Sequence, residues 1–174
     1  MPLMSAAMLL VVALGACGCI SLDFAQRSVD ARVLLAIGAS LSIGLALQKT
    51  GLAEIAAHGL MSVGGVNPYL NLLLLYIATV LATELITNNA AAVLMFPIAQ
   101  VISTELNASL LPFALAIMFG ASASFLSPVG YQTNLMVQGP GSYRFGDYFK
   151  VGIGLSLLVG ITVIFVVPMV WPFY

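Results

Sequence analysis

Charge is what this sequence lacks most. Asp, Glu, Lys and Arg make up 6% of its 174 residues, five basic against six acidic, whereas 61% of the residues are hydrophobic. A soluble domain of this size could not cover its surface with so few charges, so the composition predicts an integral membrane protein. The net charge of −1 and the lack of a basic run also exclude nucleic acid as a partner.

Residues that catalyse reactions or bind transition metals are scarce as well. Cys17 and Cys19 form a C-G-C pair, which lacks the spacing of a zinc or thioredoxin site, so we interpret both as small apolar residues. The single histidine, His58, lies four residues after Glu54, but two ligands do not make a metal site. The sequence has no Ser-His-Asp set, HExxH or phosphate loop, so we expect neither an enzyme nor an organic cofactor.

Several uncharged segments suit membrane helices. A crossing of about 30 Å takes roughly 20 helical residues, and residues 3–22 meet that length. A signal peptide or lipoprotein processed at Cys17 is the alternative there, but the basic n-region is missing, so we favour a retained transmembrane helix. Residues 33–48 form a short second span, and residues 151–171 form a last span with aromatic residues at both ends. Residues 52–61 predict an amphipathic helix at the interface.

A polar stretch interrupts the middle of the chain. In "ELITNNAAAVLMFP", residues 84–97, a Thr and two Asn follow one apolar arm and precede another. We expect arms of about 13 to 17 residues, which is fewer than a straight crossing needs. Two short helices that meet at a polar tip predict a re-entrant hairpin over residues 69–103.

A second polar interruption follows. The uncharged run of residues 106–143 is too long for one helix and contains "SPVGYQTN". Pro128 and Gly130 both disfavour a continuous helix, so we predict a helix over about residues 108–138 that is broken near the membrane centre.

Both interruptions suit ion and anion binding. Broken helices leave N-termini with partial positive charge, which attract anions, and free carbonyls, which coordinate cations. Asn and Thr oxygens ligate Na⁺, and their N–H and O–H groups donate to a substrate oxygen. Polar residues that merely hold helices together are the alternative, but two clusters that each lie at a helix break favour a site.

Glu84 is the acidic residue that we expect deepest in the membrane. It is a candidate coupling residue that binds a cation or a proton. The alternative is that it pairs with a hydroxyl such as that of Thr83, or with the backbone. The sequence leaves both interpretations open.

The basic residues predict an orientation. The loops at residues 23–32 and 139–150 lie on the same side whether the hairpin is re-entrant or crosses twice. These two loops hold all of the basic residues except Lys49. By the positive-inside rule both loops are cytoplasmic, which places both ends of the chain outside.

Three stretches carry a family resemblance: "VDARVLLAIGASLSIGLALQKTGLAE", "ELITNNAAAVLMFPIA" and "ASASFLSPVGYQTNLMVQGPGSYRFGDYFKVG". They resemble the divalent anion–sodium symporters, which are also described as sodium-sulfate, dicarboxylate and citrate transporters. "GYQTNLMV", followed by "GPG" and "YRFGD", is typical of the branch that carries TrkA-C domains between two membrane halves. The chain looks like the C-terminal half, since we find one hairpin, no internal repeat and no TrkA-C domain.

The resemblance implies an architecture. In that family each half holds a re-entrant hairpin with a Ser-Asn-Thr tip and a broken helix, and the two halves are inverted repeats. It implies that residues 1–62 are scaffold-type and residues 67–174 transport-type, in an elevator-type homodimer completed by an N-terminal half. We expect a fragment, a truncated gene product or one chain of a split transporter.

The resemblance also implies binding residues. The expected substrate ligands are Thr87, Asn88, Asn89, Pro128, Thr133 and Asn134. The expected Na⁺ ligands are Thr87, Asn88, Ser127, Gly130 and Thr133. Asn89 takes the place of the family's third-position Thr and lacks its hydroxyl.

The expected function is therefore symport of a small oxyanion, sulfate or a di- or tricarboxylate, with Na⁺ or H⁺ as the coupling ion. We expect a multi-pass protein of a bacterial inner or plasma membrane. The alternative is a non-transporting membrane module that assembles with or regulates a partner permease half, because a complete site in that family needs both halves.

Overall fold

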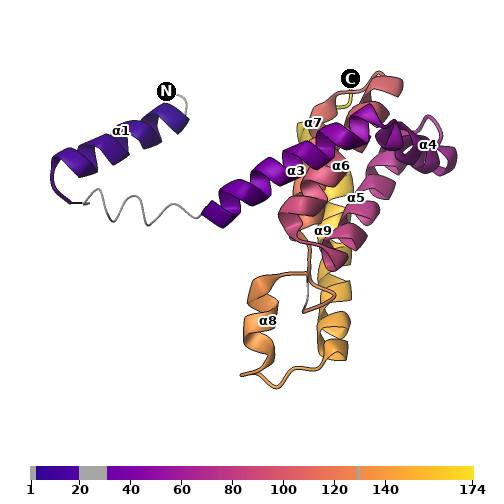
Figure 1. The fold of residues 1–174 in the computed structure, drawn as a ribbon. Helices are drawn as coiled ribbons and strands as arrows, with labels where there is room; N and C mark the ends of the chain where they lie inside the picture. The colour runs from indigo at the N-terminus through magenta and orange to yellow at the C-terminus, as the bar shows by residue number, and fades with distance from the viewer. Residues whose placement is uncertain (1–2, 20–30, 129) are drawn as a thin grey trace. The chain divides into compact units, whose positions relative to one another are not determined.

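The computed structural model describes residues 3–19, 31–128 and 130–174. The described residues contain helices and no strand, which confirms the all-α prediction (Figure 1). The helices are α1 (Leu3–Ala16), α3 (Ala31–Lys49), α4 (Leu52–Gly64), α5 (Pro68–Leu85), α6 (Asn88–Glu105), α7 (Leu110–Ser122), α8 (Gln132–Gln138) and α9 (Phe145–Val170). Among them, α5 and α9 are long and apolar enough to cross a membrane.

The chain divides into two compact units, Met1–Gly38 and Ala39–Tyr174. The first unit contains α1 and the beginning of α3, and the predicted span of residues 3–22 is helical as far as Ala16. The predicted loop of residues 23–32 lies largely outside the described residues. In the second unit, α4 confirms the short helix predicted after Gly51, and its Glu54 and His58 side chains are exposed.

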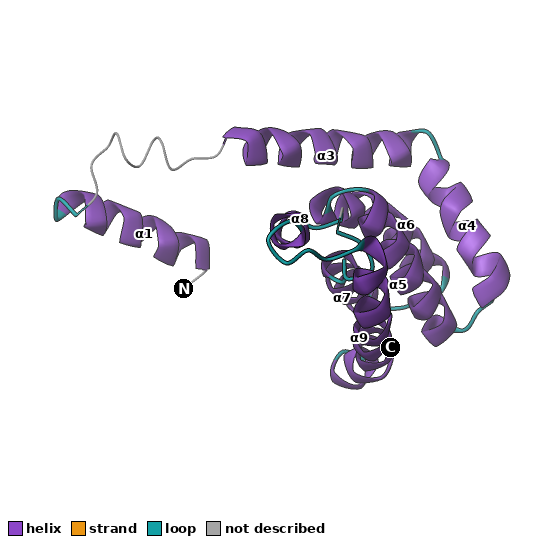
Figure 2. Cartoon of the chain, turned by 90° about the horizontal axis from the view of Figure 1, so that it is seen from below, coloured by secondary structure: helices purple, strands orange, loops and turns teal. Residues whose placement is uncertain are grey.

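Helices α5 and α6 form a helical hairpin in the predicted region (Figure 2). Ile86 and Thr87 join them, and the re-entrant character of the hairpin stays a prediction. Asn67 caps α5, because its Oδ1 accepts the backbone N–H groups of Tyr69 and Leu70 at 3.0 and 3.4 Å. Pro68 follows at the first helical position, where its missing N–H costs nothing. Thr87 caps α6 in the same way by accepting the N–H of Ala90.

The predicted arm lengths are wrong, because each arm has 18 residues. Helix α6 continues past the predicted end at Val101 to Glu105, and in its last turns Ser103 and Thr104 donate their hydroxyls to the carbonyl of Gln100. These two side chains satisfy their hydrogen bonds inside the helix and do not terminate it.

The break in the second long run begins earlier than predicted. Helix α7 ends at Ser122, before Pro128, and non-helical residues lead to the short helix α8. Figure 1 shows α8 beside the first turns of α9, where the Tyr148 hydroxyl donates to the Asn134 carbonyl at 2.9 Å. Helix α9 also begins earlier than predicted, at Phe145, because the Asp147 carboxylate accepts the N–H of Arg144 and caps the helix. The predicted loop of residues 139–150 is therefore half helical.

Helices α5, α6, α7 and α9 pack side by side around one apolar core (Figure 2). Two glycines allow the close approach. A Cβ on Gly120 of α7 would lie 3.1 Å from Cβ of Thr79, and one on Gly160 of α9 would lie 2.9 Å from Cε1 of Tyr76. Small residues at such contacts are the usual means by which membrane helices pack. This packing holds the end of α5 against the break after α7.

Candidate functional site

The two polar interruptions lie against each other in the fold. Thr83 in the last turn of α5 is fully buried, and its Oγ1 donates to the Ala121 carbonyl near the end of α7 at 2.8 Å. On the far side of the break, a Cβ on Gly130 would lie 2.7 Å from the Thr83 carbonyl and would overlap Ser124 Oγ. Only a glycine lets the break come this close to the hairpin.

Asn88 completes a cluster of polar atoms at this contact. One terminal atom of its amide lies 2.8 Å from Thr83 Oγ1, 3.2 Å from the Ala121 carbonyl oxygen and 3.2 Å from the Gly130 carbonyl oxygen. With the nitrogen in that place, which is the orientation that satisfies the amide, its two hydrogens face three acceptor oxygens. With Oδ1 there, four oxygens converge, none of them from a charged group. We define the oxygen cluster by Thr83, Asn88, Ala121 and Gly130.

The donor set of the oxygen cluster fits a hard monovalent cation. Hydroxyl, amide and carbonyl oxygens are the ligands that hard cations prefer, and carbonyls at a helix break coordinate Na⁺ in secondary transporters. Ala121 and Gly130 contribute main-chain carbonyls, and the Ala121 carbonyl, next to the end of α7 at Ser122, accepts the Thr83 hydroxyl. The amide of Asn88 can turn its oxygen or its nitrogen toward the cluster, so the same site can be satisfied with or without a cation.

Glu84 contacts the backbone of the break. Its Oε1 accepts the N–H of Leu126 at 2.8 Å, while Oε2 is buried and has no hydrogen-bond partner in the described part of the chain. Of the two partners weighed from sequence, a backbone group is therefore the one that the structure shows. The Thr83 hydroxyl is engaged by Ala121 and Asn88 instead.

Asn134 and Ser127 hold the break together internally. The two amide hydrogens of Asn134 reach the carbonyls of Ser124 and Ser127, at 3.0 and 3.2 Å. Ser127 Oγ accepts the N–H of Gly130 at 3.3 Å. Both side chains, which the sequence predicts as ligands, here fix the backbone that carries the Gly130 carbonyl.

The remaining predicted ligands lie in different places. Thr87, Asn89 and Thr133 have exposed side chains, and Pro128 is buried. Of the predicted ligands, the structure brings Asn88 to the carbonyl of Gly130, while among the described residues no hydrogen bond joins Thr87 or Asn89 to Thr133. Sequence reasoning missed Thr83 as a cluster member, because the Ala121 carbonyl that it contacts lies 38 residues away in the chain.

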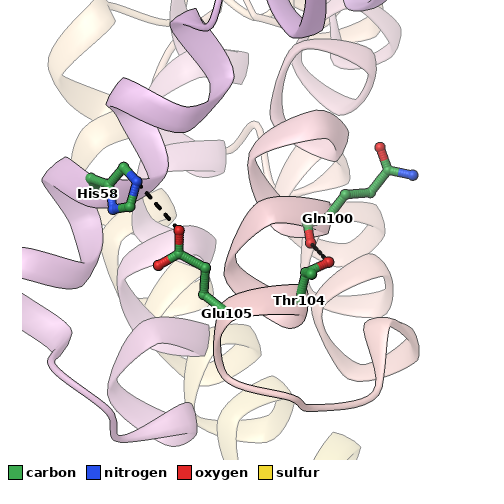
Figure 3. A network of polar contacts seen from close by, with 4 residues as sticks. All are labelled: His58, Gln100, Thr104 and Glu105. Carbon is green, nitrogen blue, oxygen red and sulfur yellow. Dashed lines mark hydrogen bonds and ion pairs between the residues drawn. The ribbon is translucent and has the colours of Figure 1, made fainter.

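A separate polar network lies near the end of α6 (Figure 3). His58 Nε2 is 3.3 Å from Glu105 Oε1, and Thr104 donates to the Gln100 carbonyl. Both members of the ion pair are largely exposed, so the pair contributes little to stability. Among the described residues, no three His, Cys, Asp or Glu side chains gather as a metal site.

Helices long and apolar enough to cross a membrane, and polar residues gathered where two helices are interrupted, are features of membrane transport proteins. Comparison with known protein families shows the family to which the chain belongs. The sequence model of the citrate transporter family matches residues 1–174, and the chain belongs to this family.

Three relatives illustrate the family's range. The uncharacterized transporter YfbS of Escherichia coli is 34% identical over 97% of this chain and 28% of its own length. The probable sodium/sulfate cotransporter 3 of Chlamydomonas reinhardtii is 38% identical over 78% of this chain and 15% of its own length. The sodium-dependent dicarboxylate transporter SdcS of Staphylococcus saprophyticus is 27% identical over 80% of this chain and 27% of its own length. The chain thus spans well under a third of each relative.

Proposed function

We propose that this chain forms the C-terminal half of a Na⁺-coupled symporter for a small oxyanion, sulfate or a di- or tricarboxylate. The observation that carries the proposal is the oxygen cluster, in which Thr83 and Asn88 of the hairpin meet the carbonyls of Ala121 and Gly130 at the break. The names of two relatives, a probable sodium/sulfate cotransporter and a sodium-dependent dicarboxylate transporter, support this class of substrate and ion.

In this proposal the oxygen cluster holds one Na⁺ ion. The ligands are the Thr83 hydroxyl, Oδ1 of Asn88 and the two main-chain carbonyls. A bound cation supplies a positive charge beside the hairpin tip, where no Lys or Arg takes part in the contacts described. The predicted ligands Thr87, Ser127 and Thr133 remain proposals, as does H⁺ as an alternative coupling ion.

The oxyanion binds at the N-terminus of α6. Thr87 and Asn89 are exposed there, and the first turn of a helix presents free N–H groups and partial positive charge to an anion. Thr133, Asn134 and Pro128 complete the substrate site from the break.

A partner half and a second protomer complete the protein in this proposal. Residues 1–62 are the scaffold and residues 67–174 the moving unit. Cross-linking of protomers in membranes tests the dimer.

A transport assay tests this function. Uptake of radiolabelled sulfate, succinate and citrate is measured in Na⁺ and in choline medium, with the whole protein as its gene encodes it. We expect Thr83→Val to raise the Na⁺ concentration for half-maximal uptake by about tenfold, because one oxygen ligand is lost. Thr79→Val is the matched control, since Thr79 is equally buried one turn earlier and, within the described part of the chain, its hydroxyl bonds to the Leu75 carbonyl alone. It should stay within about twofold of wild type.

Two results would contradict the proposal. Wild-type uptake of all three anions that is unchanged in choline medium excludes Na⁺ coupling, and equal effects of the two Val substitutions exclude the oxygen cluster as the cation site. A second candidate function is a membrane module that regulates a partner permease. It is supported by the fact that the chain covers only 28% and 15% of the length of two relatives. Co-expression decides: a partner's uptake that depends on this chain but tolerates Asn88→Ala favours the module.

A further inference from the structure

Glu84 links the hairpin to the break through a main-chain contact. Its Oε1 accepts the N–H of Leu126, which lies in the non-helical segment between α7 and α8. The preceding residue of α5, Thr83, donates to the carbonyl of Ala121, which lies near the end of α7. Thr83 and Glu84 of α5 therefore contact the chain at two points, one just before the end of α7 and one after it.

The segment is also held from its opposite side. A Cβ on Gly152 of α9 would overlap the Phe125 carbonyl oxygen and would lie 3.1 Å from the Leu126 nitrogen. The backbone at Phe125 and Leu126 thus passes directly against α9, while Glu84 of α5 accepts the hydrogen bond from the Leu126 N–H. At Phe125 and Leu126 the described part of the break makes no helical hydrogen bonds, so these contacts hold its course together with the hydrogen bonds from Asn134 to the Ser124 and Ser127 carbonyls.

The position of this segment determines the geometry of the oxygen cluster. The chain runs from Ala121, whose carbonyl is in the cluster, past Leu126 to Gly130, whose carbonyl lies 3.2 Å from the Asn88 amide. Leu126 is between these two ligands in sequence, and Glu84 is its side-chain hydrogen-bond partner. A shift at Leu126 therefore displaces the carbonyls that face Asn88.

We infer that Glu84 is a positioning residue that fixes the cation-binding carbonyls by accepting the Leu126 N–H, and is neither a cation ligand nor the proton-coupling group. This inference rests on the proposed function. It makes a distinction that the sequence left open: the site needs an acceptor oxygen at residue 84, not a carboxylate charge. A glutamine supplies that oxygen, whereas a leucine leaves the partly buried Leu126 N–H without this partner.

The test compares Glu84→Gln with Glu84→Leu in the whole protein, with Glu105→Gln and Glu105→Leu as controls at an exposed acid of α6. Two quantities are measured: the Na⁺ concentration for half-maximal uptake across pH 5.5–8.5, and the Na⁺ concentration that protects the purified protein from thermal unfolding. We expect Glu84→Gln to stay within about twofold of wild type with the same pH profile. We expect Glu84→Leu to raise both Na⁺ concentrations by about tenfold.

Each other outcome has a definite meaning. If Glu84→Gln is as impaired as Glu84→Leu, or if its pH profile differs from that of wild type, then the charge matters and the inference is wrong. If Glu84→Leu matches wild type, no positioning role exists. Wild-type protein that shows no Na⁺ dependence in either measurement refutes the proposed function itself, and the inference with it. Should Glu84→Leu not yield folded protein, Glu84→Met, of similar length and without a strong acceptor, takes its place.

Discussion

Gly130→Ala is the substitution that most directly tests the contact between hairpin and break. The added Cβ would overlap Ser124 Oγ and would lie 2.7 Å from the Thr83 carbonyl oxygen and 3.3 Å from Cα of Glu84. The serine hydroxyl can rotate away, but the other two atoms belong to the backbone of α5. The main chain at residue 130 must therefore retreat by roughly half an ångström or more.

That retreat has a cost that can be estimated. Overpacking of a buried contact typically costs about 1–3 kcal/mol. The Gly130 carbonyl, now 3.2 Å from the Asn88 amide, would move out of hydrogen-bond range. We therefore expect a lower melting temperature and about a tenfold higher Na⁺ concentration for half-maximal uptake.

Thermal unfolding in detergent and Na⁺-dependent uptake measure these effects. Gly154→Ala is the matched control, since a Cβ there meets no atom within 4 Å and the residue lies inside α9. Removing a helical glycine should stabilise the protein by about 0.5–1 kcal/mol. If Gly130→Ala has the stability and Na⁺ dependence of Gly154→Ala, the close approach of the break to α5 does not exist in the folded protein.

Two further predictions concern the break and the orientation. Tyr148→Phe should destabilise the protein by about 0.5–1.5 kcal/mol in thermal unfolding, because it removes the hydroxyl that donates to the Asn134 carbonyl; an unchanged melting temperature would contradict that contact. In a cysteine-free background, a single cysteine at Ser142 should react with an impermeant maleimide only from the cytoplasmic side, and one at Tyr174 only from outside. The reverse labelling pattern would overturn the proposed orientation.

The elements that follow from local sequence signals were predictable. Asn67-Pro68 marks the start of α5, and the polar run after Leu85 marks the hairpin tip, because capping and backbone breaks depend on residues close in sequence. The early start of α9 was also available from sequence, since an acid three residues after Arg144 is a helix-start signal.

The course of the break could not be predicted locally. Nothing in "ASASFL" opposes a helix as Pro128 does, yet α7 ends at Ser122. The reason is tertiary: Leu126 donates to Glu84 and its backbone lies against Gly152, which are 42 residues before it and 26 after it in the chain. A helical Leu126 would bond to its own helix and could not make the first contact. For the same reason Thr83 became a member of the site only when the fold brought Ala121 to it.

The geometry of α6 connects the two proposed ligands. Asn88 is the first residue of α6, so the side chain that faces the oxygen cluster and the N–H groups proposed for the anion belong to the same helical turn. A cation held by Asn88 adds positive charge to a helix end that is already favourable for anions. It also turns the Asn88 oxygen, not its nitrogen, toward the Ala121 and Gly130 carbonyls, which fixes the hairpin tip against the break. Since coupling between two sites is reciprocal in free energy, the anion must then strengthen cation binding by the same factor. Under the proposed function, a cation held by neutral residues at this helix end supplies the positive charge that a basic side chain would otherwise provide to the anion.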